Sequence, residues 1–206
     1  MKKRIVVGIG QAGIDILDNI ARDLSIPTAA VDLDRYSLHS SKADHTVFVR
    51  ETSDDYGRDR RLEIDSEIDL RSLDRLEGLI DDYDVVYIIS ALGGRAGGVI
   101  LPAVAKKGVD MGKIVFGKLI IPFEEEKDKR EIAEVYLAEI EDFFTEVDIY
   151  DNNEYIEKAE GEITLDSVYS LDSIFEEINR DILREIQRDV AYDKEERYEK
   201  MAGDRI

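Results

Sequence analysis

Short apolar runs rich in β-branched residues alternate along this chain with segments in which apolar residues recur every three or four positions. The runs predict β-strands, and the longer recurrence predicts amphipathic helices. We predict strands over residues 4–7, 28–31, 46–49, 84–89, 113–121 and 146–150. Strands that alternate with helices indicate an α/β fold, in which a doubly wound and mainly parallel sheet is covered by helices on both faces.

Two segments depart from this alternation. Residues 50–69 are polar and charged, which predicts a long loop. Residues 192–206 are almost all polar, so we expect the chain to fray there. The pattern therefore divides the chain into a domain over residues 1–170 and a central helix with a charged tail over residues 171–206. The apolar stripe of that helix consists of Leu171, Ile174, Phe175, Ile178, Ile182, Ile186 and Val190.

The composition narrows the class of protein. A chain of 206 residues, of which 43% are hydrophobic, fits one domain with a sizeable core. A net charge of −20 argues against a nucleic-acid partner, because phosphate backbones would be repelled. The chain has no cysteine, which excludes disulfides, thiolate metal sites and cysteine nucleophiles. Its first apolar run breaks at Gly8, too early to cross a membrane, so we expect no direct membrane insertion and a cytoplasmic location.

Two glycine-rich turns follow predicted strands, at the end of the sheet where α/β proteins bind their ligands. The first contains Gly8, Gly10 and Gly13, and the second runs over residues 93–98. Such glycines allow a tight turn and a close approach of the backbone to phosphate. Asp32 occupies the place of a ribose-binding acid, so the first turn alone leaves open NAD(P) binding, another nucleotide and a purely structural turn. The second turn favours a phosphate chain held from two sides, although tight helix packing would also explain it.

Over residues 3 to about 187 the order of motifs resembles the nucleotide-binding domain of the tubulin/FtsZ superfamily. Residues 10–13 are similar to its first phosphate loop, residues 31–38 to its second loop, and residues 91–105 to its signature loop and the helix that follows. The resemblance implies a bound GTP or GDP and allows a magnesium ion near Gln11. The residues that it implies for nucleotide binding are Gly8, Gly10, Gln11, Ala12, Gly13, Asp32, Asp34, Gly93, Gly94, Arg95, Ala96, Gly97, Glu126, Arg130, Asn153, Phe175 and Asn179.

The resemblance also gives individual roles to residues in the second half of the chain. It places Glu126 on the ribose, Arg130 on the nucleotide, and Asn153, in a segment similar to tubulin's D-N-E, on guanine. Phe175 and Asn179 match the aromatic residue and the amide of the family's central helix. Independently, residues four apart share one face of a helix, so these two would present a stacking ring beside an amide. The two amides, of Asn153 and Asn179, would favour guanine over adenine. Without the resemblance, Phe175 would fit a core position equally well.

The chain departs from the family pattern in three places. The signature G-G-G-T-G-T-G appears with Ala96 and Gly98 at the threonine positions and with an added Arg95, which would either bind a phosphate or fill the phosphate site. Residues 56–61 are charged and lack the Ala-Gly-Gly that senses the terminal phosphate. Nothing after residue 187 matches the family's catalytic N-x-D-x-x-D acids. We therefore expect little or no independent GTPase activity and similar affinities for GTP and GDP.

Three functional interpretations remain. The first is a divergent prokaryotic FtsZ/tubulin-like GTP- or GDP-binding protein, a cytoskeletal or assembly-related module in which a second copy or another protein covers Ile182, Ile186 and Val190. The second is a nucleotide-free interaction module of the same fold, in which Arg95 pairs with an acid. The third is an NAD(P)-binding protein, supported only by the first glycine turn and Asp32.

Overall fold

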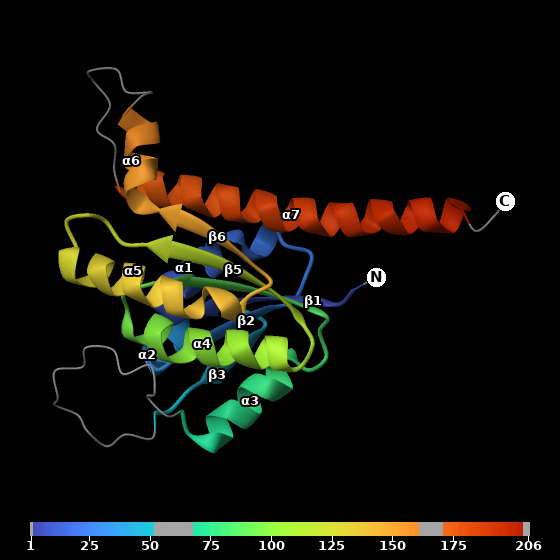
Figure 1. The fold of residues 1–206 in the computed structure, drawn as a ribbon, viewed down its shortest axis with the longest axis horizontal. Helices are drawn as coiled ribbons and strands as arrows, with labels where there is room; N and C mark the ends of the chain where they lie inside the picture. Colours follow the sequence, from blue (N-terminus) through green and yellow to red (C-terminus); the bar gives the residue numbers. More distant parts are fainter. Residues whose placement is uncertain (1, 52–67, 161–170, 204–206) are drawn as a thin grey trace.

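Six parallel strands form the centre of the molecule (Figure 1). The computed structural model describes residues 2–51, 68–160 and 171–203. The strands lie in the order β3-β2-β1-β4-β5-β6, which confirms the predicted doubly wound parallel sheet. The predicted charged stretch 56–61 lies outside the described residues. The strands are β1 (Arg4–Ile9), β2 (Thr28–Asp32), β3 (His45–Phe48), β4 (Val85–Ala91), β5 (Ile114–Ile121) and β6 (Glu146–Asp151).

Helices connect the strands and cover both faces of the sheet. In chain order they are α1 (Gly10–Ile20), α2 (Arg35–Ser40), α3 (Leu70–Ile80), α4 (Arg95–Asp110), α5 (Lys127–Ile140), α6 (Asn152–Glu160) and α7 (Leu171–Gly203). Short 3₁₀ turns follow α1 and α5, at Ala21–Asp23 and Glu141–Phe143. Parallel strands need such crossovers, because after each strand the chain must return to the end of the sheet at which the strands begin.

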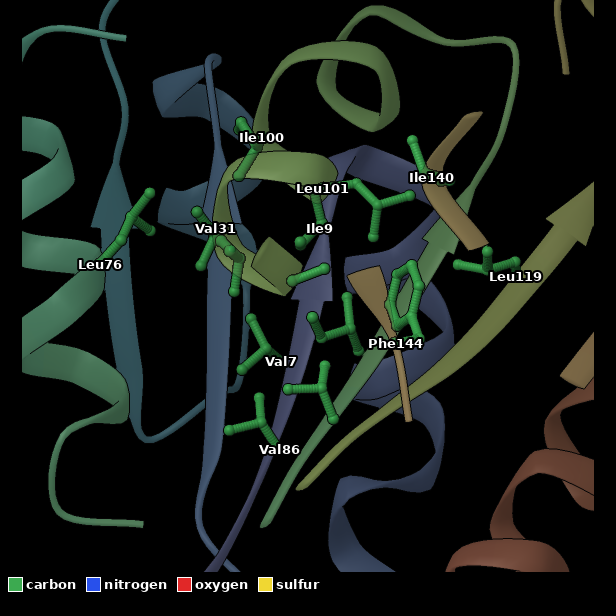
Figure 2. Close-up of a cluster of buried hydrophobic side chains, with 14 of the residues drawn as sticks. Val7, Ile9, Val31, Leu76, Val86, Ile100, Leu101, Leu119, Ile140 and Phe144 are labelled. Carbon is green, nitrogen blue, oxygen red and sulfur yellow. The ribbon is translucent and has the colours of Figure 1, made fainter. Parts of the chain in front are cut away.

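The two faces of the sheet have separate cores, because alternate residues of each strand point to opposite sides. On one face, α4 packs over β1, β4 and β5, with α5 beside it over β5 and α3 beside it near β3, and Figure 2 shows this cluster. On the other face, α1 and α7 pack over β1, β4, β5 and β6. In the central strands β1 and β4 nearly every residue is buried, which is why they read as continuous apolar runs in the sequence.

Helix α7 spans 33 residues, or about 50 Å at the usual rise per residue. It lies along one side of the sheet and runs past its end (Figure 1). It is helical as far as Gly203, where the described part ends. Ile182 and Ile186 are fully buried against the chain's own sheet, and Val190 packs partly buried beside them. The expectation that another protein covers this stripe is therefore wrong, because the sheet already does. Among the described residues no helix is long and apolar enough to cross a membrane.

The close packing of α1 on the sheet generates a first prediction. A Cβ on Gly13 would collide with the carbonyl oxygen of Ile89 in β4, whereas a Cβ on Gly78, in α3, would meet nothing within 4 Å. We expect Gly13→Ala to lower the free energy of unfolding by about 1–3 kcal/mol, because α1 must move away from the strand. The matched variant Gly78→Ala should raise it by up to about 1 kcal/mol, since alanine favours helix. Urea denaturation of both variants measures this, and equal effects would refute the packing role.

Candidate functional site

The two glycine turns meet at the carboxyl ends of β1 and β4. Gly10 adopts a φ of 71°, in the left-handed region that favours glycine, and α1 begins at this residue. A Cβ on Gly10 would lie 2.9 Å from the Cβ of Ala96, in the first turn of α4. Neither α1 nor α4 has a side-chain cap or an acidic residue in its first turn. Two helix N-termini without side-chain caps thus lie side by side, which is a favourable arrangement for an anion.

Several signature glycines are explained by packing alone. A Cβ on Gly8 would lie 2.7 Å from the carbonyl oxygen of Gly13, and a Cβ on Gly97 would lie 2.5 Å from that of Ala91. Gly93, with a φ of 77°, fits tightly against the backbone of Lys129. Gly94 is the exception, because open space surrounds the position of its missing side chain. These glycines allow α1, α4 and the start of α5 to converge, whatever the turns bind.

A cavity of about 820 Å³ opens between α1 and α7. Of the residues predicted from the sequence, it brings together Ala12, Glu126, Phe175 and Asn179. The rest of its lining comes mainly from one face of α1, from the β5–α5 loop and from the first turns of α7. These further lining residues are Asp15, Ile16, Asn19, Ile20, Asp23, Ala91, Ile120, Pro122, Phe123, Lys129, Asn152, Asp172, Glu176, Ile178, Arg180 and Leu183.

Two asparagines line this cavity with unsatisfied amide oxygens. Asn152 and Asn179 are 5% and 9% exposed, and the Oδ1 atom of each has no hydrogen-bond partner among the described residues. A buried polar atom without a partner costs about 1–3 kcal/mol, so such atoms are rare in folded proteins unless a ligand or water satisfies them. Both asparagines line the cavity, so their amide oxygens are candidate acceptors for a ligand that carries hydrogen-bond donors.

Asn152 is a residue that the sequence prediction missed, because the prediction named Asn153. The Oδ1 atom of Asn153 accepts a hydrogen bond from the backbone N–H of Glu124 at 2.9 Å and so holds the β5–α5 loop. Asn153 does not line the cavity. Its place next to Asn153 in the sequence was the signal that could have identified Asn152. Which of the two asparagines faces the cavity depends on the direction in which α6 leaves β6.

Phe175 lies at the mouth of the cavity and not in the core. It is 40% exposed, and its ring meets Phe123 edge to face with 6.2 Å between the ring centres. A half-exposed ring beside a cavity can stack on a planar group. Glu126, which precedes α5, accepts a hydrogen bond from the Lys129 ammonium at 2.6 Å. Lys129 also lines the cavity, and its backbone packs against Gly93 of the second glycine turn.

The two arginines predicted to contact the nucleotide are paired with acids. Arg130 donates from its two terminal nitrogens, Nη1 and Nη2, to the two carboxylate oxygens of Asp151 at 2.9 and 2.5 Å. Nη1 also donates to the carbonyl oxygen of Pro122 at 2.8 Å. This pairing holds the pKa of Asp151 below its usual value and raises the pKa of Arg130. Arg95 donates from Nε to Glu51 at 3.2 Å and forms a second, shorter contact to it. Neither arginine lines the cavity.

Asp32, Asp34 and Gln11 have local partners and do not line the cavity. Asp32 is 5% exposed, and its two oxygens accept from the backbone N–H of Leu33 and the hydroxyl of Ser37, both at 2.6 Å. Asp34 caps α2, and Gln11 donates to Asp15 at 2.7 Å. A carboxylate enclosed in its own turn is a poor ribose acceptor, so the geometry removes the second support for NAD(P) binding.

A buried tyrosine ties α5 to the turn that begins α4. Pro102 lies inside α4 and has no N–H, so the carbonyl oxygen of Gly98 lacks its usual helical donor. The hydroxyl of Tyr136, a residue 1% exposed on α5, donates to that oxygen instead. Burial raises the pKa of this hydroxyl, so it stays protonated and able to donate. The first turn of α4 is thus held in place by a neighbouring helix.

Comparison with known proteins gives a consistent assignment. A family described as Tubulin/FtsZ family, GTPase domain, matches residues 3–160. Curated relatives include cell division protein FtsZ 2 of Halobacterium salinarum, 25% identical over 157 residues, which cover 74% of this chain and 40% of that protein. FtsZ 2 of Methanocaldococcus jannaschii is 26% identical over 157 residues, covering 74% and 41%. The chain therefore spans about 40% of the length of these relatives.

Solved structures show the same fold. An empty FtsZ dimer of M. jannaschii matches with a TM-score of 0.68 and 20% identity, over 89% of this chain and 52% of that one. The GDP-bound monomer of CetZ1 from Haloferax volcanii matches with a TM-score of 0.65 and 22% identity, over 88% and 58%. At these identities the likeness concerns the fold alone.

The tie between α5 and α4 generates a second prediction. Tyr136→Phe leaves the carbonyl oxygen of Gly98 without a donor while it keeps the buried ring. We expect the free energy of unfolding to fall by about 1–3 kcal/mol, the cost of an unsatisfied buried acceptor. Tyr36→Phe is the control, because that side chain is 87% exposed and its loss should change stability by less than about 0.5 kcal/mol. Urea denaturation measures both, and a neutral Tyr136→Phe would contradict the role of this bond.

Proposed function

This chain belongs to the tubulin/FtsZ family, and on that premise we propose that it binds a guanine nucleotide, GTP or GDP, in the cavity between α1 and α7. The observation that carries the proposal is the pair of buried, unsatisfied amide oxygens of Asn152 and Asn179. Guanine offers an N1–H and an N2 amino group side by side on one edge, so it can donate to both oxygens. Adenine carries an amino group beside an acceptor nitrogen, which would leave one amide oxygen unpaired.

The remaining contacts of the proposed complex follow from the geometry of the site. Phe175 and Phe123 offer ring surface to the base at the cavity mouth. The phosphates would point to the adjacent N-termini of α1 and α4, whose backbone N–H groups bind anions. Because Arg130 is held by Asp151 and Lys129 by Glu126, those N–H groups would supply most of the phosphate contacts.

A magnesium ion is part of the proposal as a companion of the phosphates. Among the described residues there is no cluster of three or more acidic or histidine side chains that could hold a metal. Magnesium commonly keeps several waters and binds through phosphate oxygens with one or two protein ligands, so such a cluster is not required. Gln11, hydrogen-bonded to Asp15, lies at the start of α1 where the phosphates would end.

We further propose that the chain by itself hydrolyses GTP slowly or not at all. Ala96 and Gly98 provide no hydroxyl at the positions where the family signature has threonines. Positioned donors around the reacting phosphate account for much of the rate of phosphoryl transfer. On the family relation we place the protein in the cytoplasm as a cytoskeletal or assembly-related module, with itself or another protein as partner. A phosphate release rate that climbs steeply with protein concentration would oppose the slow-hydrolysis proposal.

A nucleotide-free interaction module is the second candidate, and one observation favours it. Arg95 stands at the first position of α4, where the helix dipole disfavours a cation, and Glu51 neutralises it. An arginine paired in this way can take the place of a ligand beside the helix N-terminus. The two candidates make opposite predictions for the removal of Arg95.

Guanine selectivity is the third prediction. We expect GDP to bind and to raise the melting temperature, while ATP and NAD do not. Asn152→Ala and Asn179→Ala should each weaken GDP binding by about 10- to 100-fold, equivalent to the loss of one buried hydrogen bond. Asn153→Ala, which removes only the loop contact to Glu124, should leave the preference for guanine unchanged. Titration calorimetry measures these affinities, and equal binding of GDP and ATP would refute the assignment.

The fourth prediction separates the two candidate functions. If Arg95 turns from Glu51 to a bound phosphate, Arg95→Ala should weaken GDP binding by about tenfold or more, because a guanidinium forms charge-assisted, bidentate contacts with phosphate. Glu51→Gln leaves the arginine in place and removes its competing charge, so that variant should bind GDP more tightly than the unmodified chain. Tighter binding by Arg95→Ala would show instead that Arg95 plugs the phosphate site, which favours the nucleotide-free module.

A further inference from the structure

The apolar face of α7 does not by itself specify how far the helix slides along the sheet. Its buried residues Ile174, Ile178, Ile182 and Ile186 recur every four positions and are the same residue type. A shift of α7 by four residues, roughly 6 Å along its axis, would place isoleucine on isoleucine and keep nearly the same packing. Some other interaction must therefore favour the observed register.

A buried lysine supplies a polar interaction at one fixed point of the sheet. Lys118, in β5, is 2% exposed and is the only lysine among the described buried residues. Its ammonium contacts Asp148 of β6 and lies 2.9 Å from Oε2 of Glu185 on α7. Tyr150 of β6 also donates to Glu185. A buried charge is costly unless it is paired, so displacing Glu185 from this position would be unfavourable.

The acids of α7 also recur at one-turn spacing. Asp181, Glu185 and Asp189 lie four residues apart, on one face of the helix. Asp181 accepts from the hydroxyl of Tyr155 at 3.0 Å, and burial raises the pKa of Asp189. In a shifted register an aspartate, shorter by one methylene, would face Lys118. The observed register is thus the one that brings the glutamate to the lysine.

The register decides which α7 residues enter the cavity. Phe175 and Asn179 lie on the same helix as Glu185, which is six residues after Asn179, and both line the cavity. A one-turn shift would replace Asn179 at its position by Phe175 or Leu183, neither of which has an amide. We propose that Lys118 is a positioning residue that fixes the axial register of α7 through Glu185 and thereby places Phe175 and Asn179 in the cavity. The effect of this placement on guanine binding rests on the proposed function, whereas the register itself does not.

Cysteine crosslinking can measure the register, because the chain has no native cysteine. The side chain of Gln187 on α7 donates to the backbone oxygen of Asp23 at 3.1 Å, so these two positions are adjacent. We would prepare Asp23→Cys together with Gln187→Cys as the reporter of the observed register. Asp23→Cys with Leu183→Cys, or with Ala191→Cys, reports a shift by one turn in either direction. Yields with a short thiol-reactive crosslinker, without nucleotide, then compare the registers.

In the protein with Lys118 intact, we expect the crosslinking yield of the Gln187 pair to exceed that of the other pairs by about tenfold or more. Lys118→Met should reduce this preference to about threefold or less. The same substitution should lower the affinity for GDP by about tenfold. Lys106→Met is the matched control, because Lys106 pairs with Asp110 on the exposed face of α4 and its loss should change neither readout. A folded Lys118→Met protein with an undiminished preference for the Gln187 pair would overturn the proposal.

A second variant keeps the test decisive if Lys118→Met does not fold. Glu185→Gln retains the size of the side chain and an acceptor for Tyr150 but removes the charge that Lys118 pairs with. The same criteria then apply to it: spreading of the crosslinks supports the proposal, and an unchanged pattern overturns it. If the crosslinks spread but the unmodified chain binds no guanine nucleotide, the positioning of α7 stands and the proposed function fails.

Discussion

The candidate site depends on the close approach of two helices to the central strands. Gly13 and Gly97 lack side chains where α1 and α4 meet the carbonyl oxygens of β4, so both helices can begin close together at the carboxyl ends of the strands. A Cβ added to Gly10 would collide with the Cβ of Ala96, so the two helix starts lie close together. Because unpaired backbone N–H groups concentrate at helix N-termini, this packing alone creates an environment for an anion. The glycines are thus structural first, and the proposed phosphate binding would use the arrangement that they permit.

The other half of the cavity depends on α7, and its requirements are different. Its isoleucines give the helix a buried face against the sheet, but their even spacing leaves its position along the sheet open. The buried contacts of Lys118 with Asp148 and Glu185 are costly in isolation and can specify one register because of that cost. Apolar packing therefore attaches this wall of the cavity, while polar pairing sets where Phe175 and Asn179 lie.

The sequence allowed the fold to be predicted because strands buried on both faces read as continuous apolar runs, as in β1 and β4. It also placed Phe175 and Asn179 on one face of a helix, because spacing along a single helix is a local property, and both residues line the cavity. The partners of Arg95 and Arg130 could not be predicted in this way. Glu51 and Asp151 are 44 and 21 residues distant and meet the arginines only after the strands are assembled.

Similar reasons apply to the asparagine pair at the start of α6 and to the apolar stripe of α7. Asn152 and Asn153 are equivalent in the sequence, and only the direction in which α6 leaves β6 decides which one faces the cavity. The stripe at Ile182 and Ile186 was recognised as apolar, but the sequence does not reveal that the chain's own sheet covers it. In each case the local pattern identified the type of residue, and the tertiary arrangement decided its partner.

The central claim is that this cavity binds a guanine nucleotide, and the most direct measurement is to identify what the purified protein carries. The protein would be purified without added nucleotide and denatured, and the supernatant separated by ion-exchange chromatography against nucleotide standards. The account predicts GDP or GTP at up to about one equivalent per chain, since a site with buried unsatisfied acceptors should retain its ligand. Recovery of an adenine nucleotide or NAD instead would contradict it.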